Sequence, residues 1–423
     1  MLDRLFALET FGIKLGLDNI ALLCDALDHP ERAFKTLHVA GTNGKGSVTA
    51  MVHTALVGAG VAAARYISPH LLTLNERFVI GTEPVSDDAL AAVTRDVFAR
   101  IDMLKANGRL AVTPTFFEVT TAIAFELFRR ARTEVAVIEV GLGGRFDATN
   151  VVLPEVAAIT SIGFDHQQHL GDSLGAIAGE KAGIIKPGVP VVVGRLPDEA
   201  MRVIGEVAAE RQAPLIAAGA GVNLEAEMRD GRATLAIETP AARYGPLTLG
   251  LRGDHQVGNA LVAVRMLEAA RGRGIDVSRS AIERGLTAVT WPARLEVIDV
   301  GEQRVLIDAA HNADGARALA AYLRRWHPER PALVAGVMRD KDVDEILAAL
   351  LPATSLLVAT EAATPRALPA SELAARARRI APAHPVQVEP SPAAALQQAL
   401  GQAQTVCVAG SIFLAGEVRA ILR

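Results

Sequence analysis

The amino-acid sequence predicts an α/β protein made of two sheet-containing units. Short β-rich apolar runs alternate with longer helical patterns along the chain, and a second series of this kind follows Trp291-Pro292. Strands that are apolar on both faces are typical of parallel sheets covered by helices. We therefore expect an N-terminal P-loop-type unit with a parallel sheet and a small antiparallel annex, followed by a C-terminal doubly wound, Rossmann-like unit.

The N-terminal series begins with a strand and a helix and continues with further pairs. Strands are expected at 36–40, 135–140 and 156–161, and helices at 47–58 and 117–131. Between 214 and 252 the pattern changes to short alternating stretches, two of which are joined by a hairpin-like turn at Arg229-Asp230-Gly231. This region is predicted to form the annex, and a helix at 259–271 follows it.

The C-terminal series alternates regularly. Strands are expected near 304–307, 332–336, 355–359, 385–388 and 405–409, and helices near 314–326, 343–350, 371–379, 392–400 and 412–422. The boundary falls between 285 and 295, which divides the chain into domains 1–288 and 289–423.

The composition excludes several classes of protein. Of 423 residues, 50% are hydrophobic and 21% are charged, as in a folded globular protein without long disordered tails. The balance of 43 Lys and Arg against 47 Asp and Glu leaves no basic block, so nucleic acid is not an expected partner. Cys24 and Cys407 stand too far apart for a disulfide framework or a CxxC site, which favours the cytoplasm.

Neither secretion nor a membrane is expected. The N-terminal segment carries Asp3 and Glu9 and lacks the pattern of a secretion signal. No apolar run approaches the roughly 20 residues that a membrane-spanning helix needs.

The segment 41–47, GTNGKGS, lies between a predicted strand and a predicted helix. Glycines allow main-chain N–H groups to surround phosphate oxygens, Lys45 adds a mobile charge, and the Ser47 hydroxyl can bind Mg²⁺. The spacing departs from GxxxxGK[ST], because Gly46 separates Lys45 from Ser47. The alternative is a glycine-rich turn with a solvated lysine.

Glu139 and His166 each follow a predicted strand. The carboxyl ends of parallel strands face the crevice where open α/β sheets bind ligands, so Glu139 is a candidate Mg²⁺ ligand beside the phosphate loop. Alternatively, Glu139 forms an ion pair with Arg145. His166 could complete a divalent-ion site, although Mg²⁺ prefers oxygen and a lone histidine is more often structural.

Lys181 and Lys186 precede Pro187-Gly188, a helix stop signal, and by residue type they are helix-end cations. A lysine whose amine stays neutral can instead add CO₂ and become a carbamate, which replaces a cation with a metal-binding anion. Residue types alone do not select between these two interpretations.

Polar residues later in the chain also have two interpretations each. Asn259 could contact a purine edge, and Arg294 could bind phosphate or pair with Glu296. Asp308, at the end of a predicted strand, could hold ribose hydroxyls or could cap the next helix together with Asn312.

In their order along the chain, these motifs resemble the folylpolyglutamate synthase / dihydrofolate synthase family of the Mur ligase superfamily. The matching strings are GTNGKGS, SPHL, TFFE, EVGLGGRFDATN, DHQQHLG, EKAGIIKPG, the Asn259 segment, WPARLE and DAAHN, with GSIFLAGE at 410–417. Nine ordered motifs between 41 and 312 are far more specific than any one of them.

The resemblance implies an ATP-dependent amide ligase. In this family ATP phosphorylates a carboxylate, and the amino group of L-glutamate attacks the acyl phosphate and releases phosphate. The implied acids are dihydropteroate, in dihydrofolate synthesis, and tetrahydrofolate glutamates, in polyglutamylation. ATP as co-substrate, Mg²⁺ as cofactor and a monomeric state are implied as well.

The resemblance also assigns residues to roles. For ATP they are Asn43, Gly44, Lys45, Gly46, Ser47, Asn259, Arg294 and Asp308, and for Mg²⁺ they are Ser47, Ser68, Glu139 and His166. Lys181 corresponds to the family's carbamylated lysine, and His311 is implied to lie near glutamate or phosphate. Lys45, Lys181 and His311 are the implied catalytic residues.

The family's pterin site matches residues from three parts of the chain. They are Leu15, Gly16 and Leu17, then Thr115, Phe116 and Phe117, then Arg145, Phe146 and Asp147. Phe116 or Phe117 could pack on a flat pterin or benzoyl ring. Two residues depart from the family pattern: Lys14 stands where bifunctional members can carry an acid, which weighs against dihydropteroate binding, and Ala313 replaces a usual proline.

Three other functions compete with a bifunctional ligase. A muramyl-peptide ligase generally has a nucleotide-sugar domain before the phosphate loop, whereas 40 residues precede Gly41 here. A monofunctional folylpolyglutamate synthase is the closest alternative. A non-catalytic nucleotide-binding regulator is disfavoured, because it has no use for Lys45, Glu139, His166 and Lys181 together.

Overall fold

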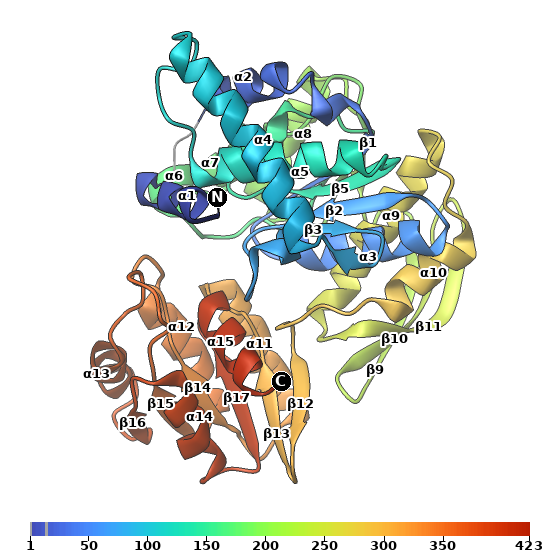
Figure 1. Cartoon of the computed structure of the whole chain (residues 1–423). Coiled ribbons are helices and arrows are strands. Elements are labelled where there is room, and N and C mark those ends of the chain that lie inside the picture. The colour runs from blue at the N-terminus through green and yellow to red at the C-terminus, as the bar shows by residue number, and fades with distance from the viewer. Residues whose placement is uncertain (1, 13–15) are drawn as a thin grey trace.

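The structure is a computed structural model that describes residues 2–12 and 16–423. The described residues form an eight-stranded, a three-stranded and a six-stranded sheet. The six-stranded sheet and its helices, orange to red in Figure 1, form a lobe beside the larger N-terminal part. The predicted α/β class is confirmed.

The eight-stranded sheet has the order β4-β3-β2-β5-β1-β6-β7-β8. Its strands are β1 (Lys35–Ala40), β2 (Ala63–Tyr66), β3 (Phe78–Ile80), β4 (Glu83–Pro84), β5 (Val135–Glu139), β6 (Val156–Ile159), β7 (Val191–Val193) and β8 (Leu215–Ala217). From β2 to β8 all neighbours are parallel, whereas β3 and β4 pair antiparallel at the edge. Because β1 lies between β5 and β6, the loops that follow these three strands meet at one edge of the sheet.

Helices cover both faces of this sheet, because its strands are apolar on both faces. They are α1 (Leu2–Phe6), α2 (Asp18–Ala26), α3 (Lys45–Gly58), α4 (Asp87–Ala106), α5 (Phe116–Arg130), α6 (Gln167–Leu170), α7 (Leu174–Ala182), α8 (Asp198–Glu210), α9 (His255–Gly272) and α10 (Arg279–Ala288), with short 3-10 turns η1 (Ala7–Phe11), η2 (Pro30–Arg32), η3 (Leu74–Arg77) and η4 (Ala148–Val151). On β5, Val135 and Val137 pack towards α3, α9 and α10, while Ala136 and Ile138 pack towards α2, α4 and α5.

The annex differs from its prediction at one end. Its antiparallel strands are β9 (Asn223–Arg229), β10 (Arg232–Glu238) and β11 (Arg243–Arg252), and the predicted hairpin turn has positive φ at Asp230 and Gly231. Residues 215–217 were expected in the annex, but they form β8 and pair parallel with β7. The reason is that α8 carries the chain back across the sheet, so the next strand extends that sheet.

The C-terminal sheet has the order β12-β13-β17-β14-β15-β16. Its strands are β12 (Glu296–Val300), β13 (Gln303–Ile307), β14 (Ala332–Ala335), β15 (Leu356–Ala359), β16 (Val386–Val388) and β17 (Thr405–Ala409). Its helices are α11 (Ala313–Trp326), α12 (Val343–Leu350), α13 (Ala370–Ile380), α14 (Pro392–Leu400) and α15 (Ile412–Ile421), with a 3-10 turn η5 (Leu351–Ala353). These elements confirm the predicted series, and the unexpected β12 is an antiparallel edge strand against β13. None of the helices described has both the length and the apolar character needed to cross a membrane.

Helix α10 packs unusually closely on α3, and this contact provides a test of the fold. A Cβ atom added to Gly285 would lie 2.5 Å from the Cβ atom of Ala55 and 2.8 Å from its backbone nitrogen. We expect Gly285→Ala to lower the free energy of unfolding by about 1–3 kcal/mol, because the two helices must move apart. Urea denaturation measures this change.

Gly272 provides the matched control, since a Cβ atom there would have nothing within 4 Å. Gly272→Ala should be neutral or stabilising by up to about 1 kcal/mol. Equal stabilities of the two variants would contradict the close packing of α3 and α10.

Candidate active site

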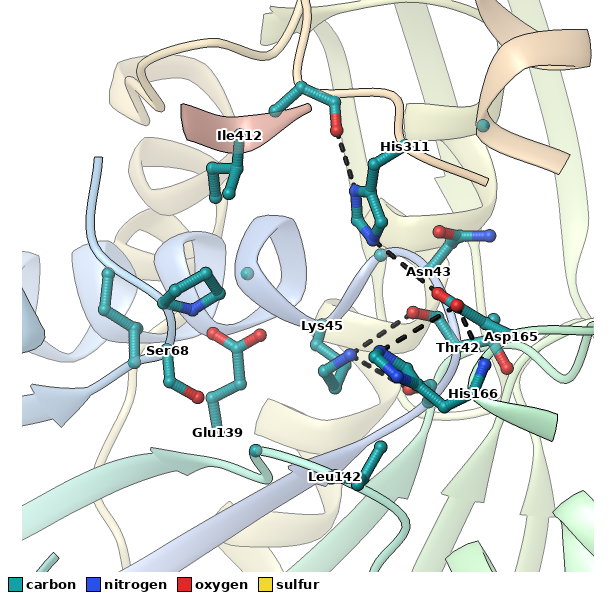
Figure 2. Close-up of a pocket in the computed structure, with 18 of the residues that line it drawn as sticks. Thr42, Asn43, Lys45, Ser68, Glu139, Leu142, Asp165, His166, His311 and Ile412 are labelled. Carbon is teal, nitrogen blue, oxygen red and sulfur yellow. Dashed lines mark hydrogen bonds and ion pairs between the residues drawn. The ribbon is translucent and has the colours of Figure 1, made fainter. Parts of the chain in front are cut away.

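A cavity of about 1460 Å³ lies where the N-terminal and C-terminal sheets face each other. The loops that follow β1, β5 and β6 line it on one side, and the loops that follow β13, β14 and β17 line it on the other. The carboxyl ends of the central strands of both sheets therefore border one space, which is where open α/β sheets bind ligands. Figure 2 shows side chains from both sheets pointing into it.

The phosphate loop joins β1 to α3 and needs its glycines. Gly41 and Gly44 have φ of 152° and 86°, and a Cβ atom at Gly44 would lie 2.4 Å from Oδ1 of Asn259. The Lys45 ammonium donates to the carbonyl oxygens of Gly41 and Thr42, at 3.0 and 3.2 Å. No side chain caps the N-terminus of α3, so its first N–H groups are available to an anion.

Helix α9 supports this loop from behind. Nε2 of Gln256 donates to the hydroxyl of the buried Ser47 at 3.3 Å, and Nδ2 of Asn259 donates to Oε1 of Gln256 at 2.9 Å. Asn259 and Ser47 both line the cavity, as do Asn43, Gly44 and Gly46. Gln256 was not predicted to have a role. The available signal was its position three residues before Asn259, which is about one helical turn.

Glu139 ends β5 beside the phosphate loop and is buried. Burial raises the pKa of this carboxyl to about 7, while the charges of Lys45 and Arg294 and the backbone N–H of Ser68 act in the opposite direction. Figure 2 shows Glu139 beside Ser68 and facing the side of the cavity that holds Lys45. The alternative pairing with Arg145 is wrong, because Arg145 contacts Glu180 at 3.5 Å.

The loop after β6 carries Asp165 and His166. The ammonium of Lys341, which follows β14, lies 2.5 Å from Oδ1 of Asp165 and 3.3 Å from Nε2 of His166. Burial and the charge of Lys341 lower the pKa of His166 to about 4, so its ring is neutral at neutral pH. The ion pair between Asp165 and Lys341 joins the two sheets and was not predicted.

His311 and Asn312 extend this contact from the loop after β13. Nδ1 of His311 lies 2.9 Å from the carbonyl oxygen of Ala309, and its Nε2 lies 3.6 Å from Oδ2 of Asp165. Nδ2 of Asn312 donates to Oδ1 of Asn43 and to Oδ2 of Asp165, both at 3.0 Å. The C-terminal sheet is thereby connected directly to the phosphate loop.

Arg294 and Asp308 also line the cavity. The structural roles considered for them were an ion pair with Glu296 and a helix cap, respectively. Glu296 pairs with Arg419 at 3.0 Å rather than with Arg294, so the alternative pairing of Arg294 is wrong. Asp308 accepts the N–H groups of Leu295 and Ala310, each at 2.9 Å, and does not cap α11.

The cap of α11 comes from Asn312 alone, whose Oδ1 accepts the N–H of Gly315 at 2.9 Å. This part of the alternative interpretation is confirmed.

Lys181 lies on α7 and borders the cavity with its side chain buried. Burial and the nearby charge of Lys45 lower the pKa of its amine to about 7. Within the part of the chain that the structure describes, no acid lies within ion-pair distance of this amine. Lys186 is used differently, since its amine donates to the carbonyl oxygen of Asn150 at 2.9 Å.

Three phenylalanines in the lining of the cavity form what is here called the aromatic wall. Phe116, Phe117 and Phe146 line it, and Phe146 is 44% exposed. Phe116 stacks on Phe6 with ring centroids 6.0 Å apart. Phe117 stacks on Tyr66 at 6.1 Å, so the wall is held by further aromatic rings.

The other residues of the predicted pterin site are divided. Gly16, Thr115 and Asp147 line the cavity, although Thr115 also caps α5 and Asp147 caps η4. Arg145 and Leu17 do not line it: Arg145 pairs with Glu180 on the outside, and Leu17 packs against the core beneath α2 and α5. Leu15, like Lys14, lies outside the described residues.

Comparisons with known proteins identify the family. The Mur ligase middle domain matches residues 88–267, and the Mur ligase, glutamate ligase domain matches residues 293–412. The chain is 36% identical over 343 residues to the dihydrofolate synthase/folylpolyglutamate synthase of Bacillus subtilis, an alignment that covers 80% of this chain and 79% of that protein. The chain belongs to the dihydrofolate synthase/folylpolyglutamate synthase family.

Other members of the family are similar over most of their length. The dihydrofolate synthase/folylpolyglutamate synthase of Mycobacterium tuberculosis is 37% identical over 377 residues, which is 86% of this chain and 77% of that protein. The crystal structure of folylpolyglutamate synthase from the same organism, complexed with ADP and AMPPCP, has a TM-score of 0.92 at 34% identity and covers 100% of this chain and 98% of that one.

E. coli FolC in complex with DHPP and ADP has a TM-score of 0.88 at 30% identity, covering 100% of this chain and 97% of that one. As a member of this dihydrofolate synthase/folylpolyglutamate synthase family, the chain is an ATP-dependent acid–amino-acid ligase.

The ion pair between Lys341 and Asp165 predicts a large stability effect. Both side chains are buried, at 7% and 9% exposed, and Lys341→Met would leave the Asp165 carboxylate without its main cation. We expect the free energy of unfolding to fall by about 3–5 kcal/mol. Urea denaturation followed by probes in each sheet measures the loss.

Arg317→Met is the matched control, because it removes only exposed ion pairs, with Asp314 at 2.8 Å and with Glu345 at 2.7 Å. Its expected cost is at most about 1 kcal/mol. A cost for Lys341→Met no larger than that of the control would show that the contact between the sheets is weak.

Proposed function

We propose that this ligase joins L-glutamate to dihydropteroate and to tetrahydrofolate glutamates through an acyl-phosphate intermediate. The observation that carries the proposal is the cavity, in which a phosphate-binding loop, a buried carboxylate and a low-pKa lysine adjoin an aromatic wall. A carboxylate becomes a good electrophile only when phosphate is its leaving group, and two anions must approach each other first. The positive end of α3 and Lys45 lower the cost of that approach.

The two domains divide this work. Residues 1–288 bind ATP and the acid, while residues 289–423 bring glutamate and complete the ATP site with Arg294, Asp308 and His311. Contacts of Asn312 with Asn43 and Asp165 support this division, because they hold the second domain against the phosphate loop. Closure of the two domains would exclude water from the acyl phosphate.

ATP phosphates bind at the N–H groups of Gly44, Lys45, Gly46 and Ser47. Lys45 now satisfies two loop carbonyls, and a short swing of its flexible side chain would bring the ammonium to a phosphate oxygen. Asn43, within the loop, donates to Oδ1 of Asn312 at 3.3 Å, and Asn259 lies against Gly44.

The residues around Glu139 fit a bound Mg²⁺ ion. Glu139 and the hydroxyls of Ser47 and Ser68 offer oxygen atoms, and a buried carboxylate without a directly paired cation gains from a divalent one. His166 offers a neutral nitrogen. Since the described residues contain no group of three His, Cys, Asp or Glu side chains suited to a metal, water and phosphate oxygens would complete the coordination. When bound, Mg²⁺ would neutralise charge on the transferred phosphoryl group.

The acid substrate lies along the aromatic wall, with its ring against Phe116, Phe117 or Phe146 and with Gly16 and Thr115 nearby. A monofunctional folylpolyglutamate synthase, the activity named for a relative from Lacticaseibacillus casei that is 33% identical over 408 residues, is the alternative.

We place the ligase in the cytoplasm and propose that it acts as a monomer. Both cysteines are buried free thiols, which supports a reducing compartment. A cavity lined from both sheets of one chain supports a site that needs no second copy.

The proposal predicts two glutamate-dependent reactions. Phosphate release from ATP should require glutamate plus dihydropteroate in one assay and glutamate plus tetrahydrofolate in the other. Lys45→Ala should lower both rates by about 100-fold or more, because the phosphoryl charge loses its ammonium. If the wild-type enzyme used tetrahydrofolate but not dihydropteroate, it would be a monofunctional folylpolyglutamate synthase.

Lys35→Ala is the control for Lys45, since Lys35 lies at the other end of β1 and outside the cavity. It should retain both activities. Unchanged amide formation in Lys45→Ala would contradict the assignment of the phosphate loop.

We also propose that Lys181 is carbamylated. Its buried amine has a pKa of about 7, so the neutral form that attacks CO₂ is abundant from neutral pH upwards. Enzyme depleted of CO₂ should lose activity, and bicarbonate should restore it, to a greater extent as pH rises through 7. Electron density at Nζ would display the modification.

Lys181→Met should be inactive and should not respond to bicarbonate. Lys186→Met, which removes a lysine that hydrogen-bonds Asn150, should keep the bicarbonate response. Wild-type activity that is independent of CO₂ would rule out the carbamate.

A further inference from the structure

Arg77 is a buried cation that has no carboxylate partner among the described residues. It ends η3 just before β3 and is 7% exposed. The other buried arginine among the described residues, Arg419, is paired with Glu296 at 3.0 Å, and the half-buried Arg265 is paired with Glu268 at 2.9 Å. A buried charge without such a partner is costly. Arg77 therefore lacks the carboxylate that neutralises Arg419.

Glu76, the acid next to Arg77 in the sequence, already accepts other hydrogen bonds. The carboxylate of Glu76 accepts the backbone N–H groups of Leu71, Leu72 and Thr73, at 2.8, 3.0 and 2.9 Å. These bonds hold the loop between β2 and η3. Glu76 is thus unavailable to neutralise the guanidinium.

Neutral groups hold Arg77 in place instead. Its Nε donates to Nδ1 of His70 at 2.9 Å, so this ring nitrogen acts as an acceptor and carries no proton. The guanidinium lies over the ring of Phe116, 5.1 Å from the centroid, and near the hydroxyl of Tyr66. These contacts fix its orientation without removing its charge.

Arg77 borders the cavity at the aromatic wall. Both Arg77 and Phe116 line it, and Arg77 interacts over longer range with Glu9 on η1 and with Glu139 at the end of β5. It therefore lies between the N-terminal segment and the end of β5. An aromatic surface with a fixed cation beside it suits a flat ring that carries a carboxylate.

We propose that Arg77 binds a carboxylate of the acid substrate through its planar guanidinium. This inference rests on the proposed function, since the pteroyl acids combine an aromatic ring with a carboxylate at one end. The ring packs on Phe116, and Arg77 receives the carboxylate beyond it. Arg77 thereby directs the acid towards the γ-phosphate held at Lys45.

The test compares Michaelis constants for the three substrates. In Arg77→Gln, KM for dihydropteroate and for tetrahydrofolate should rise about 10- to 100-fold, the range of a charge-assisted hydrogen bond. KM for ATP and for glutamate should stay within a factor of about three of wild type. Arg265→Gln, the control, removes a half-buried arginine that lies outside the cavity, and it should leave every KM unchanged.

Two further variants separate recognition from folding. Arg77→Lys keeps the buried charge but loses the planar fork, so it should fold and show a KM for the acid raised about 10-fold. In Arg77→Ala, added guanidinium ion should restore activity, while ammonium at the same ionic strength should not. A wild-type KM for the acid in Arg77→Lys, or equal rescue by both cations, would overturn the proposal.

The remaining outcomes are also decisive. A loss confined to tetrahydrofolate overturns the proposal, because the contact would then be with the α-carboxylate, which dihydropteroate lacks, and not with the carboxylate directed towards the phosphate. A rise in KM for glutamate alone overturns it, because Arg77 would then hold the amino-acid substrate. Wild-type enzyme that is inactive with both acids would instead refute the proposed function.

Discussion

The burial of charged groups at the ends of β1, β5 and β6 is the constraint on which the rest of the site depends. Glu139 ends β5, Lys45 begins α3 after β1, and Lys181 lies on α7 after β6. They border one cavity because β1 lies between β5 and β6. Loss of water shifts the pKa of Glu139 up and that of Lys181 down, each to about 7. Such groups change protonation or bind a counter-ion at little cost, and a site that handles phosphate and carboxylate needs this property.

The contact between the two sheets adds a second requirement. Asp165 receives Lys341 and Asn312 from the C-terminal sheet, and Asn312 also reaches Asn43 in the phosphate loop. The Asp165 carboxylate thus joins two loops of the C-terminal lobe to one edge of the N-terminal sheet. Because Asn312 also caps α11, a shift of that helix is transmitted to the loop.

Much of this architecture can be predicted from local patterns, and the exceptions have physical reasons. Strands buried on both faces, such as β13 and β17, appear in the sequence as continuous apolar runs. The glycines at 41 and 44 predict a tight loop. β8 was assigned to the annex because three residues do not reveal which sheet they join. The pairing of Lys341 with Asp165 spans 176 positions, and no local pattern encodes it.

The strand order of the C-terminal sheet has a consequence for protein synthesis. β17 follows β13 to β16 in the chain but inserts between β13 and β14, whose following loops carry His311 and Lys341. A nascent chain that has already folded its phosphate loop therefore lacks the opposing half of the cavity. That half can assemble only after β17 has been synthesised, so the two sheets cannot enclose a ligand before then.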